Sequence, residues 1–272
     1  MASKAAPKVD QFKLGPWTFT SSKSHILVSG GPRREQFEAS LRLPQLPEMI
    51  FDKNILRVEH QSGFGMEFNA LDALKRVDPE HDLMKVAVAQ QWAESRSDCE
   101  HIKDVIKPFD WTYTTDYQGT LFGTEGNEIK CFASDERIDI EKLKVKEQIL
   151  YYADLLLFED ELADNGSSTL NVKMRVMSSG FFILLRFYLR VDNVLIRLCD
   201  TRIHHEFDKC HFLREYTVKE ILFKDLPVPH QLYNDPNEIA PYLKLKEERY
   251  ERLQLPQSHM QYLYPDMDLA PR

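Results

Sequence analysis

The side chains best suited to chemistry gather in one short segment of the chain, His204-His205-x-x-Asp208-x-Cys210-His211. Imidazole, thiolate and carboxylate groups are the usual protein ligands of transition metals, so this segment raises the hypothesis of a metal-dependent hydrolase. The spacing argues against it, because neighbouring residues of a strand point to opposite faces, which would separate His204 from His205. We therefore predict a solvated strand end with a cysteine in the core, and retain the hydrolase as the alternative.

Carboxylates form a second group, Glu159-Asp160-Glu161 followed by Asp164, and paired acids can perform general acid–base catalysis. The residues before them have apolar side chains near helical spacing, which predicts a helix over residues 139–161. The carboxylates would then occupy its last turn, where exposed charge is the ordinary outcome although negative charge is mildly unfavourable at a helix C-terminus. We predict an exposed charged face here, with a binding role as the alternative.

Aromatic side chains recur at Trp111, Tyr113 and Tyr117, and such rings can stack on nucleic-acid bases. Alternating positions also place these residues on one face of a sheet, where they form ordinary core. The formal net charge of −8 favours core, because an acidic chain repels a polyanion. We predict no nucleic-acid partner.

The glycine and serine motifs of common enzymes are missing from the chain. It contains neither a G-x-G-x-x-G nor a G-x-x-x-x-G-K-[ST] phosphate loop, and it has no G-x-S-x-G nucleophile elbow. We therefore predict a protein that is not an enzyme and that binds no cofactor and no metal.

Three consecutive strand-like runs cover residues 168–177, 181–191 and 194–202, and the short turns SSG and DN separate them. This pattern predicts a β-meander whose middle strand, apolar on both faces, lies centrally. Asp200 and Arg202 lie at the end of the third run. There a loop can present them to a partner, or they can form a salt bridge with each other, and both interpretations stay open.

Further elements must hold this meander in place. Strand patterns cover residues 17–28, 54–60, 66–68, 110–117, 120–122 and 130–133, and helix patterns cover 33–43, 72–77, 139–161, 217–223 and 238–253, while 83–94 suits either. The order of elements predicts an α+β fold with antiparallel sheets flanked by helices, in one compact domain spanning residues 1–272. We expect its core over residues 12–250, with flexible ends at 1–11 and 254–272.

The composition bears on the compartment of the protein. No apolar run approaches the roughly 20 residues of a membrane-spanning helix, and the N-terminus lacks the apolar stretch of a secretory signal. The four cysteines are irregularly spaced, which suits a reducing environment. We predict a cytoplasmic monomer without membrane contact.

Several long blocks of the sequence carry a family resemblance. They are LPEMIFDKNILRVEH (46–60), SGFGMEFNALDAL (62–74), VIKPFDWTYTTDYQGTL (105–121), LLLFEDELADNG (155–166), VKMRVMSSGFFILLRFYLRVDNVLIRLCDTRIHHEFDK (172–209) and LREYT (213–217). With these blocks the chain resembles the TIPRL family, the regulators of TOR signalling. The similarity runs from about Gly15 to Leu243, which is most of the chain.

The resemblance implies a non-catalytic α+β protein that binds the catalytic subunits of type 2A serine/threonine protein phosphatases and inhibits or sequesters them. It also implies four partner-binding residues: Asp72 in FNALDAL, Ile138 in IDIEKL, and Leu198 and Asp200 in LCDTR. Relatives can carry methionine at the position of Leu198, which keeps an apolar contact of different shape. We expect these apolar and acidic side chains to form a groove for the C-terminal tail of the phosphatase.

Overall fold

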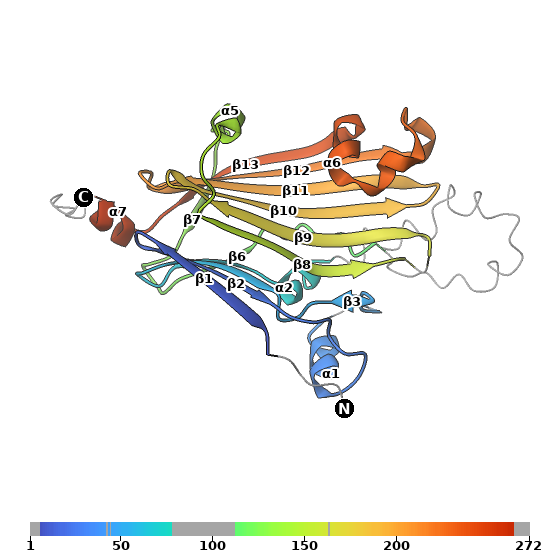
Figure 1. Ribbon diagram of the computed structural model, residues 1–272, viewed down its shortest axis with the longest axis horizontal. Helices are drawn as coiled ribbons and strands as arrows, with labels where there is room; N and C mark the ends of the chain where they lie inside the picture. The colour runs from blue at the N-terminus through green and yellow to red at the C-terminus, as the bar shows by residue number, and fades with distance from the viewer. Residues whose placement is uncertain (1–5, 42, 44, 78–111, 163, 264–272) are drawn as a thin grey trace, which may run out of the picture.

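Two antiparallel sheets form the body of the protein and confirm the predicted α+β fold. The computed structural model describes residues 6–41, 43, 45–77, 112–162 and 164–263. The five-stranded sheet has the order β1 (Lys8–Leu14), β2 (Trp17–Lys23), β4 (Ile55–His60), β5 (Gly65–Phe68) and β6 (Thr120–Phe122). The eight-stranded sheet has the order β3 (Met49–Ile50), β8 (Tyr151–Asp160), β9 (Gly166–Val176), β10 (Gly180–Val191), β11 (Leu195–Glu206), β12 (His211–Leu222), β13 (Lys244–Gln254) and β7 (Lys130–Ala133). Figure 1 shows the two sheets as stacked layers.

The main hydrophobic core lies between the two sheets. Strand β10 turns Phe181, Ile183, Leu185, Phe187 and Leu189 toward it, and all are buried. From the other sheet, the rings of Trp17 and Phe19 meet Phe181 with centroids 6.0 and 5.4 Å apart. Alternation along each strand thus gives both sheets one apolar face, and the two faces pack against each other.

The opposite, outer face of the eight-stranded sheet is covered at one end by residues 223–243, here called the cover segment. It contains η2 (Phe223–Asp225), η3 (His230–Asn234), α6 (Pro236–Ile239) and η4 (Ala240–Tyr242). A second apolar cluster joins it to the sheet, made of Tyr188, Ile196, Leu198, Ile221, Tyr233, Ile239 and Leu243. The middle strands are therefore buried on both faces at this end, as their apolar composition predicts.

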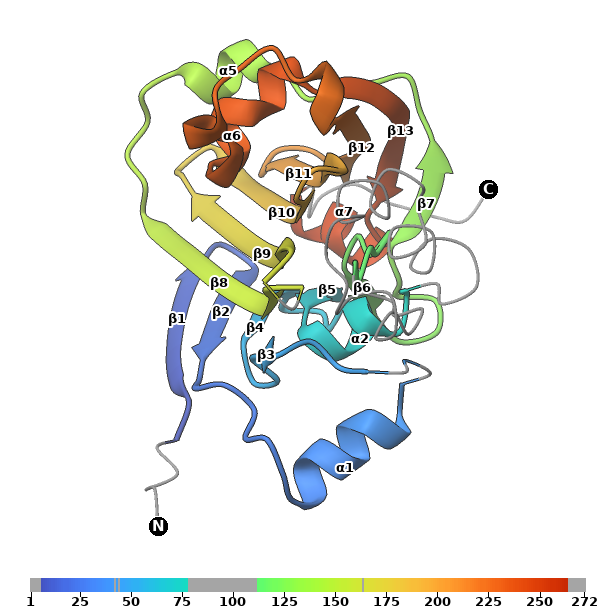
Figure 2. The same cartoon turned by 90° about the vertical axis from the view of Figure 1, so that its right-hand side faces the viewer.

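The other end of the outer face is crossed by residues 134–150, here called the strap. The strap follows β7, which forms one edge of the sheet, and leads into β8, which adjoins the other edge. It contains α5 (Ile140–Lys144), and its last residue, Leu150, donates its N–H to the carbonyl of Val176 at 2.8 Å. Figures 1 and 2 show α5 and α6 on the same side of the sheet.

The long helix predicted over residues 139–161 is wrong. The segment forms α5, the rest of the strap and strand β8, in which Tyr151, Ala153 and Leu155 are buried and Tyr152 is exposed. Apolar residues of this run suit helical spacing as well as strand alternation. Pairing of β8 with β9 along almost its whole length decides between the two, because a strand's preference comes mainly from its neighbours.

Two further predicted helices are corrected by the same kind of pairing. Residues 217–223 belong almost entirely to β12, and residues 238–253 contain the end of α6, η4 and most of β13. The charged sequence of β13 carries no clear alternation, but it pairs with β12 along its length.

Most other predictions are confirmed. Strands β9, β10 and β11 form the predicted meander, with β10 inside the sheet. Helices α1 (Pro32–Ala39) and α2 (Ala70–Leu74) overlap the predicted helices, and β2, β4, β5, β6 and β7 lie in predicted strands. In the strand predicted over residues 110–117, the described part forms only an isolated bridge between Thr115 and Val77. Tyr113 and Tyr117 are core residues as predicted, while Trp111 and residues 83–94 lie outside the described residues.

Both segments expected to be flexible contain regular structure. Strand β1 begins at Lys8, and α7 (Gln257–Leu263) follows β13. Helix α7 is anchored by the fully buried His259, whose Nδ1 lies 3.3 Å from Nε2 of His60 and whose Nε2 lies 3.1 Å from the Lys209 carbonyl oxygen. The N–H of Ser62 donates to Nδ1 of His60 at 3.2 Å, so His60 carries its proton on Nε2 and donates to His259. No helix within the described ranges is long and apolar enough to cross a membrane.

Candidate partner-binding site

Asp200 lies in the middle of β11 on the outer face, not at the strand end where we predicted it. Its side chain is 3% exposed and accepts hydrogen bonds from Nε and Nη2 of Arg186 at 2.7 and 2.8 Å. Arg202 donates from Nη2 to the same carboxylate at 2.9 Å. One of the two open interpretations, a salt bridge between Asp200 and Arg202, is therefore confirmed, and a second guanidinium joins it.

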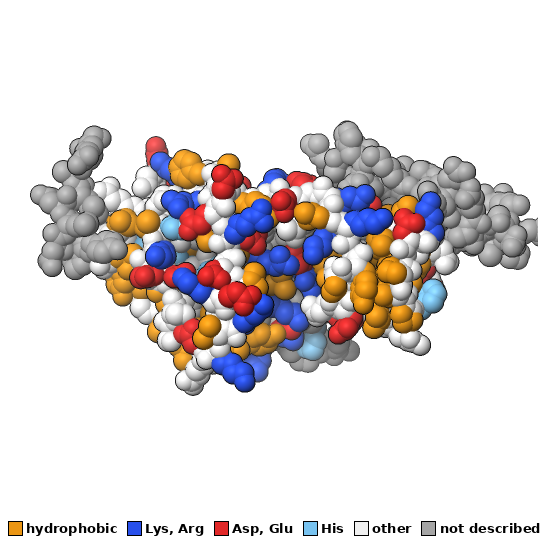
Figure 3. Space-filling model, turned by 90° about the horizontal axis from the view of Figure 1, so that it is seen from above, with side chains coloured by type: hydrophobic (Ala, Val, Ile, Leu, Met, Phe, Trp, Pro, Cys, Tyr) orange, Lys and Arg blue, Asp and Glu red, His pale blue; other side chains and the backbone are white. Residues whose placement is uncertain are grey.

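These three residues, here called the outer-face ion cluster, join two guanidinium groups to one carboxylate. Arg186 also donates from Nη1 to Oδ1 of Asn237 at 2.7 Å, which ties the cluster to α6 of the cover segment. Figure 3 shows basic side chains gathered in the middle of this face. Guanidinium groups held in place by a buried carboxylate keep N–H donors for a further anion, such as a carboxylate of a partner.

Leu198 precedes Asp200 by two residues on the same face of β11, and it is also buried. It belongs to the apolar cluster beneath the cover segment and lies opposite Tyr188 of β10. In this structure Leu198 therefore supports α6 from below, and α6 in turn presents Asn237 to Arg186.

Ile138 lies at the start of the strap, where its side chain is buried. Its N–H donates to Oε1 of Glu215 on β12 at 2.8 Å, and Glu215 lies opposite Arg202 in the β11–β12 register. The strap thus reaches the outer face beside the ion cluster. The structure brings Ile138, Leu198 and Asp200 together on one face of the eight-stranded sheet.

Asp72 lies elsewhere, in α2, which follows β5 of the five-stranded sheet. Asn69 caps this short helix by accepting the N–H of Asp72 at 2.8 Å. The Asp72 carboxylate accepts from Asn69 Nδ2 at 3.0 Å, from Thr120 Oγ1 at 2.8 Å and from Lys75 Nζ at 3.4 Å. Burial acts to raise the pKa of Asp72, but these hydrogen bonds outweigh it and hold the pKa below its ordinary value.

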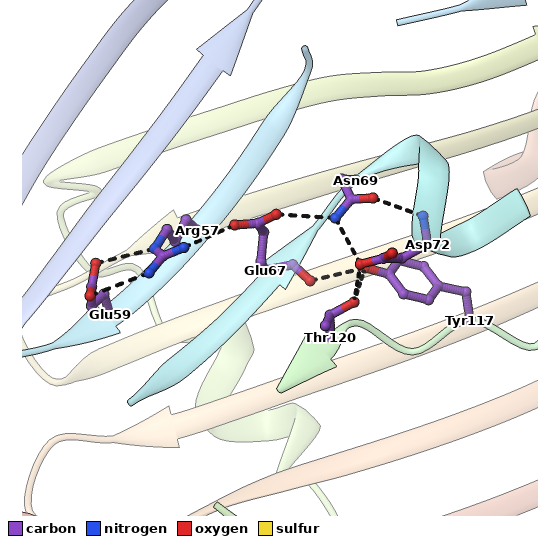
Figure 4. A network of polar contacts seen from close by, with 7 residues as sticks. All are labelled: Arg57, Glu59, Glu67, Asn69, Asp72, Tyr117 and Thr120. Carbon is purple, nitrogen blue, oxygen red and sulfur yellow. Dashed lines mark hydrogen bonds and ion pairs between the residues drawn. The ribbon is translucent and has the colours of Figure 1, made fainter. Parts of the chain in front are cut away.

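The contacts of Asp72 belong to a polar chain along the five-stranded sheet (Figure 4). Glu67 accepts from Asn69 at 3.1 Å and from Arg57 at 3.1 Å, and Arg57 also pairs with Glu59. Asp72 keeps a side chain that is 30% exposed, so it remains available to a partner while its orientation is fixed.

The histidine segment does not converge on one site. His204 faces the outer side of β11 and His205 lies in the core, as strand alternation predicts. The ring of His205 lies 5.4 Å from Trp17 and 4.6 Å from Phe212, and burial holds its pKa well below the ordinary value. In the part of the chain that the structure describes, no group of three or more His, Cys, Asp and Glu is placed to hold a metal. The described residues of this segment therefore add no support to the alternative of a metal-dependent hydrolase.

The predicted helical turn of carboxylates is wrong, because Glu159 and Asp160 end strand β8, although Glu161 and Asp164 are exposed as predicted. Asp160 is buried and accepts the N–H groups of Leu162 at 2.6 Å and Glu48 at 3.0 Å. Burial raises its pKa to about 6. Glu159 and Glu161 line a pocket on the outer face, and burial together with the charge of Glu161 raises the pKa of Glu159. Asp160 thus joins two loops to β8.

Sequence reasoning identified Asp200 and Arg202 of the ion cluster but not their supports. Arg186 interrupts the apolar run of β10, which is a signal that a charged partner can lie nearby, and the structure pairs it with Asp200. Glu215 and Asn237 carried no such signal, because their roles depend on how the strap and the cover segment fold back over the sheet.

Comparison with known proteins gives a consistent result. The sequence model of the TIP41-like family matches residues 49–227. A human protein named TIP41-like protein is 53% identical over 247 residues, covering 90% of each chain. The protein of Saccharomyces cerevisiae named type 2A phosphatase activator TIP41 is 40% identical over 234 residues, covering 80% of this chain and 65% of the yeast protein. Its namesake in Schizosaccharomyces pombe is 35% identical over 226 residues, covering 81% and 87%.

Proposed function

The chain belongs to the TIP41-like family, and from that premise we propose that it binds catalytic subunits of type 2A serine/threonine protein phosphatases. In this proposal it is a non-catalytic regulator that inhibits or sequesters the phosphatase, as a cytoplasmic monomer in TOR signalling. The names of the two yeast relatives support a phosphatase partner. The observation that carries the proposal is the outer-face ion cluster, a preorganised set of guanidinium donors flanked by the strap and the cover segment.

The C-terminal tail of the phosphatase is the proposed occupant of the outer face. An extended tail presents a terminal carboxylate and side chains on both sides of its backbone, and Arg202, whose side chain is 27% exposed, offers donors to the carboxylate. Asp200 and Leu198 are buried, so they act by positioning Arg186, Arg202 and α6. Ile138 acts by fixing the strap beside them.

Asp72 belongs to a second contact in this proposal. It lies on the five-stranded sheet, separated from the outer face by the main core, so one short tail does not reach both. We therefore assign Asp72 to the folded body of the catalytic subunit. An exposed carboxylate with fixed hydrogen bonds sets the register of such a contact at little entropic cost.

The test titrates the purified chain against an immobilised type 2A catalytic subunit, intact and with its C-terminal tail removed. Tail removal should weaken binding at least about tenfold. Arg202→Gln should weaken binding to the intact subunit by a similar factor and have no effect on the truncated one. Asp72→Asn should weaken binding to both forms equally.

Arg33→Gln, at an exposed arginine of α1, is the matched control and should change neither affinity. If the unaltered chain binds both phosphatase forms equally, the outer face is not the binding site of the tail. If it binds neither form, the proposal of a type 2A phosphatase partner is refuted. A phosphatase assay on a phosphopeptide decides the direction of regulation. Lower activity supports restraint, whereas higher activity agrees with the yeast names and overturns the inhibitory part of the proposal.

A further inference from the structure

A pocket of about 480 Å³ lies between the strap and the outer face of the eight-stranded sheet. Residues 142–147 and Ile149 of the strap form one wall, and Arg175, Met177, Ser179, His204 and Glu206 of the sheet form the other. None of these residues belongs to the outer-face ion cluster. The volume lies within the range of pockets that bind ligands, about 300–1,000 Å³.

The pocket is basic although the chain as a whole is acidic. Lys142, Lys144, Lys146 and Arg175 line it, against only Glu147 and Glu206. Two of the lysines are paired, Lys142 with Glu206 at 3.1 Å and Lys144 with Glu141 at 2.7 Å, and Glu147 accepts hydrogen bonds from Ser178 and Ser179. Lys146 and Arg175 therefore keep the lining basic. Burial lowers the pKa of His204, so its ring is uncharged at neutral pH and can donate or accept a hydrogen bond.

Arg175 is the least satisfied group in the pocket. Its Nη2 donates to the Leu143 carbonyl oxygen of the strap at 3.0 Å, and its guanidinium lies 5.4 Å from the ring centre of Phe182. Its Nε is buried without a hydrogen-bond partner, and Arg175 forms no ion pair with any described residue. The Arg175 guanidinium therefore carries a positive charge and hydrogen-bonding capacity that the described residues leave largely unused beside the pocket.

The strap also exposes apolar side chains that a soluble protein ordinarily buries. Val145 and Ile149 line the pocket with 69% and 51% of their surface exposed, and the row continues beyond it through Leu150 and Tyr152. Tyr152 lies on β8, where residues 151–156 have no strand partner among the described residues on the side away from β9. An apolar row that leaves the pocket toward an open strand edge suits an extended chain better than a compact small molecule.

We propose that the pocket beneath the strap binds an acidic peptide segment of a partner protein. A carboxylate of the peptide pairs with the guanidinium of Arg175, and neighbouring apolar side chains of the peptide pack on Val145 and Ile149. The basic lining supplies the charge complementarity, and the exposed apolar row supplies the contact area. This site shares no residue with the contacts proposed for the phosphatase.

The first experiment measures fluorescence anisotropy of a fluorescein-labelled heptapeptide that alternates Glu and Leu, titrated with the full chain. Matched peptides replace every Glu by Gln or by Lys. The Glu peptide should bind saturably and at least about tenfold more tightly than the Lys peptide, and its affinity should fall with added salt. Equal binding of the Glu and Lys peptides, or no saturable binding of the Glu peptide, would overturn the proposal.

Variants of the chain locate the site. Arg175→Gln should weaken the Glu peptide at least about tenfold, since a hydrogen bond between two charged groups is lost. Val145→Ser, at an exposed position that spares folding, should weaken it as well, whereas Arg76→Gln, an exposed arginine near α2, should leave it unchanged. Unchanged affinity in Val145→Ser and in a folded Arg175→Gln would refute the pocket. Phosphatase binding by Arg175→Gln should stay intact, so the two proposals fail separately.

Discussion

The buried pair of His60 and His259 makes the stability of the protein depend on pH in a defined window. Burial, followed by the charge of His259, lowers the pKa of His60 from 6.5 to about 4. The folded protein therefore keeps His60 neutral at pH values where the unfolded chain protonates it. The stability from this neutral ring is fully present above pH 6.5 and is lost as the pH falls through 4.

The size of the effect follows from the two pKa values. Between pH 7 and pH 5, proton linkage at His60 alone lowers the free energy of unfolding by about 1.8 kcal/mol. Burial also lowers the pKa values of His205 and His259, which adds to this loss, whereas the raised pKa of Asp160 offsets part of it. The part due to His60 is isolated by His60→Gln, because the amide can accept from Ser62 and donate to His259 without titrating.

The assay is urea denaturation at pH 7 and pH 5, followed by circular dichroism. The loss of stability between the two pH values should be about 1.8 kcal/mol smaller in His60→Gln than in the unaltered protein. His25→Gln, at an exposed histidine, is the matched control and should reproduce the unaltered loss. If His60→Gln loses as much stability as the unaltered protein, the reasoning from burial of the histidine pair is refuted.

Two further predictions concern the outer face. Asp200→Asn should lower the free energy of unfolding by about 2 kcal/mol, because it leaves two partly buried guanidinium groups without a carboxylate. The control Asp154→Asn, at the exposed pair with Lys173, should lower it by under about 0.5 kcal/mol. Equal losses of the two variants in urea denaturation would contradict this prediction. Leu198→Ala should lower the free energy of unfolding by about 3 kcal/mol and Leu198→Met by under about 1.5 kcal/mol, because only the first opens a cavity beneath the cover segment. If thermal melts rank the two variants in the opposite order, the cover segment does not pack on Leu198.

Local sequence patterns predicted the meander well because each of its strands pairs with a strand that is next to it in the sequence. The turns at SSG and DN join strands that pair with their sequence neighbours, and β10 is apolar throughout. The same reasoning failed for β8, where the apolar residues fit two periodicities and the decision came from β9. It failed for β13, whose charged residues show no pattern and whose place is set by β12.

The sequence indicated which residue types form the ion cluster of the candidate site, but not which of the candidate residues are buried. A salt bridge between Asp200 and Arg202 was one of two interpretations of the sequence, and the structure forms it and adds Arg186 to it. The burial of Leu198 and Ile138 depends on the cover segment and the strap, which return to the sheet from distant parts of the chain. No local pattern encodes such a return, so the sequence did not show that these two side chains are buried.

The order in which the eight-stranded sheet is completed differs from the order in which its strands are synthesised. Strands β8 to β12 pair with their immediate neighbours, so this part can assemble from local contacts as the chain emerges. Strand β7 is made earlier but must wait for β13, since residues 130–133 pair with 251–254. Until β13 arrives, the edge of β12 is open to pairing with other chains. A chain that ends before Lys244 would therefore leave β12 as an unpaired edge strand, and exposed edges of this kind favour aggregation.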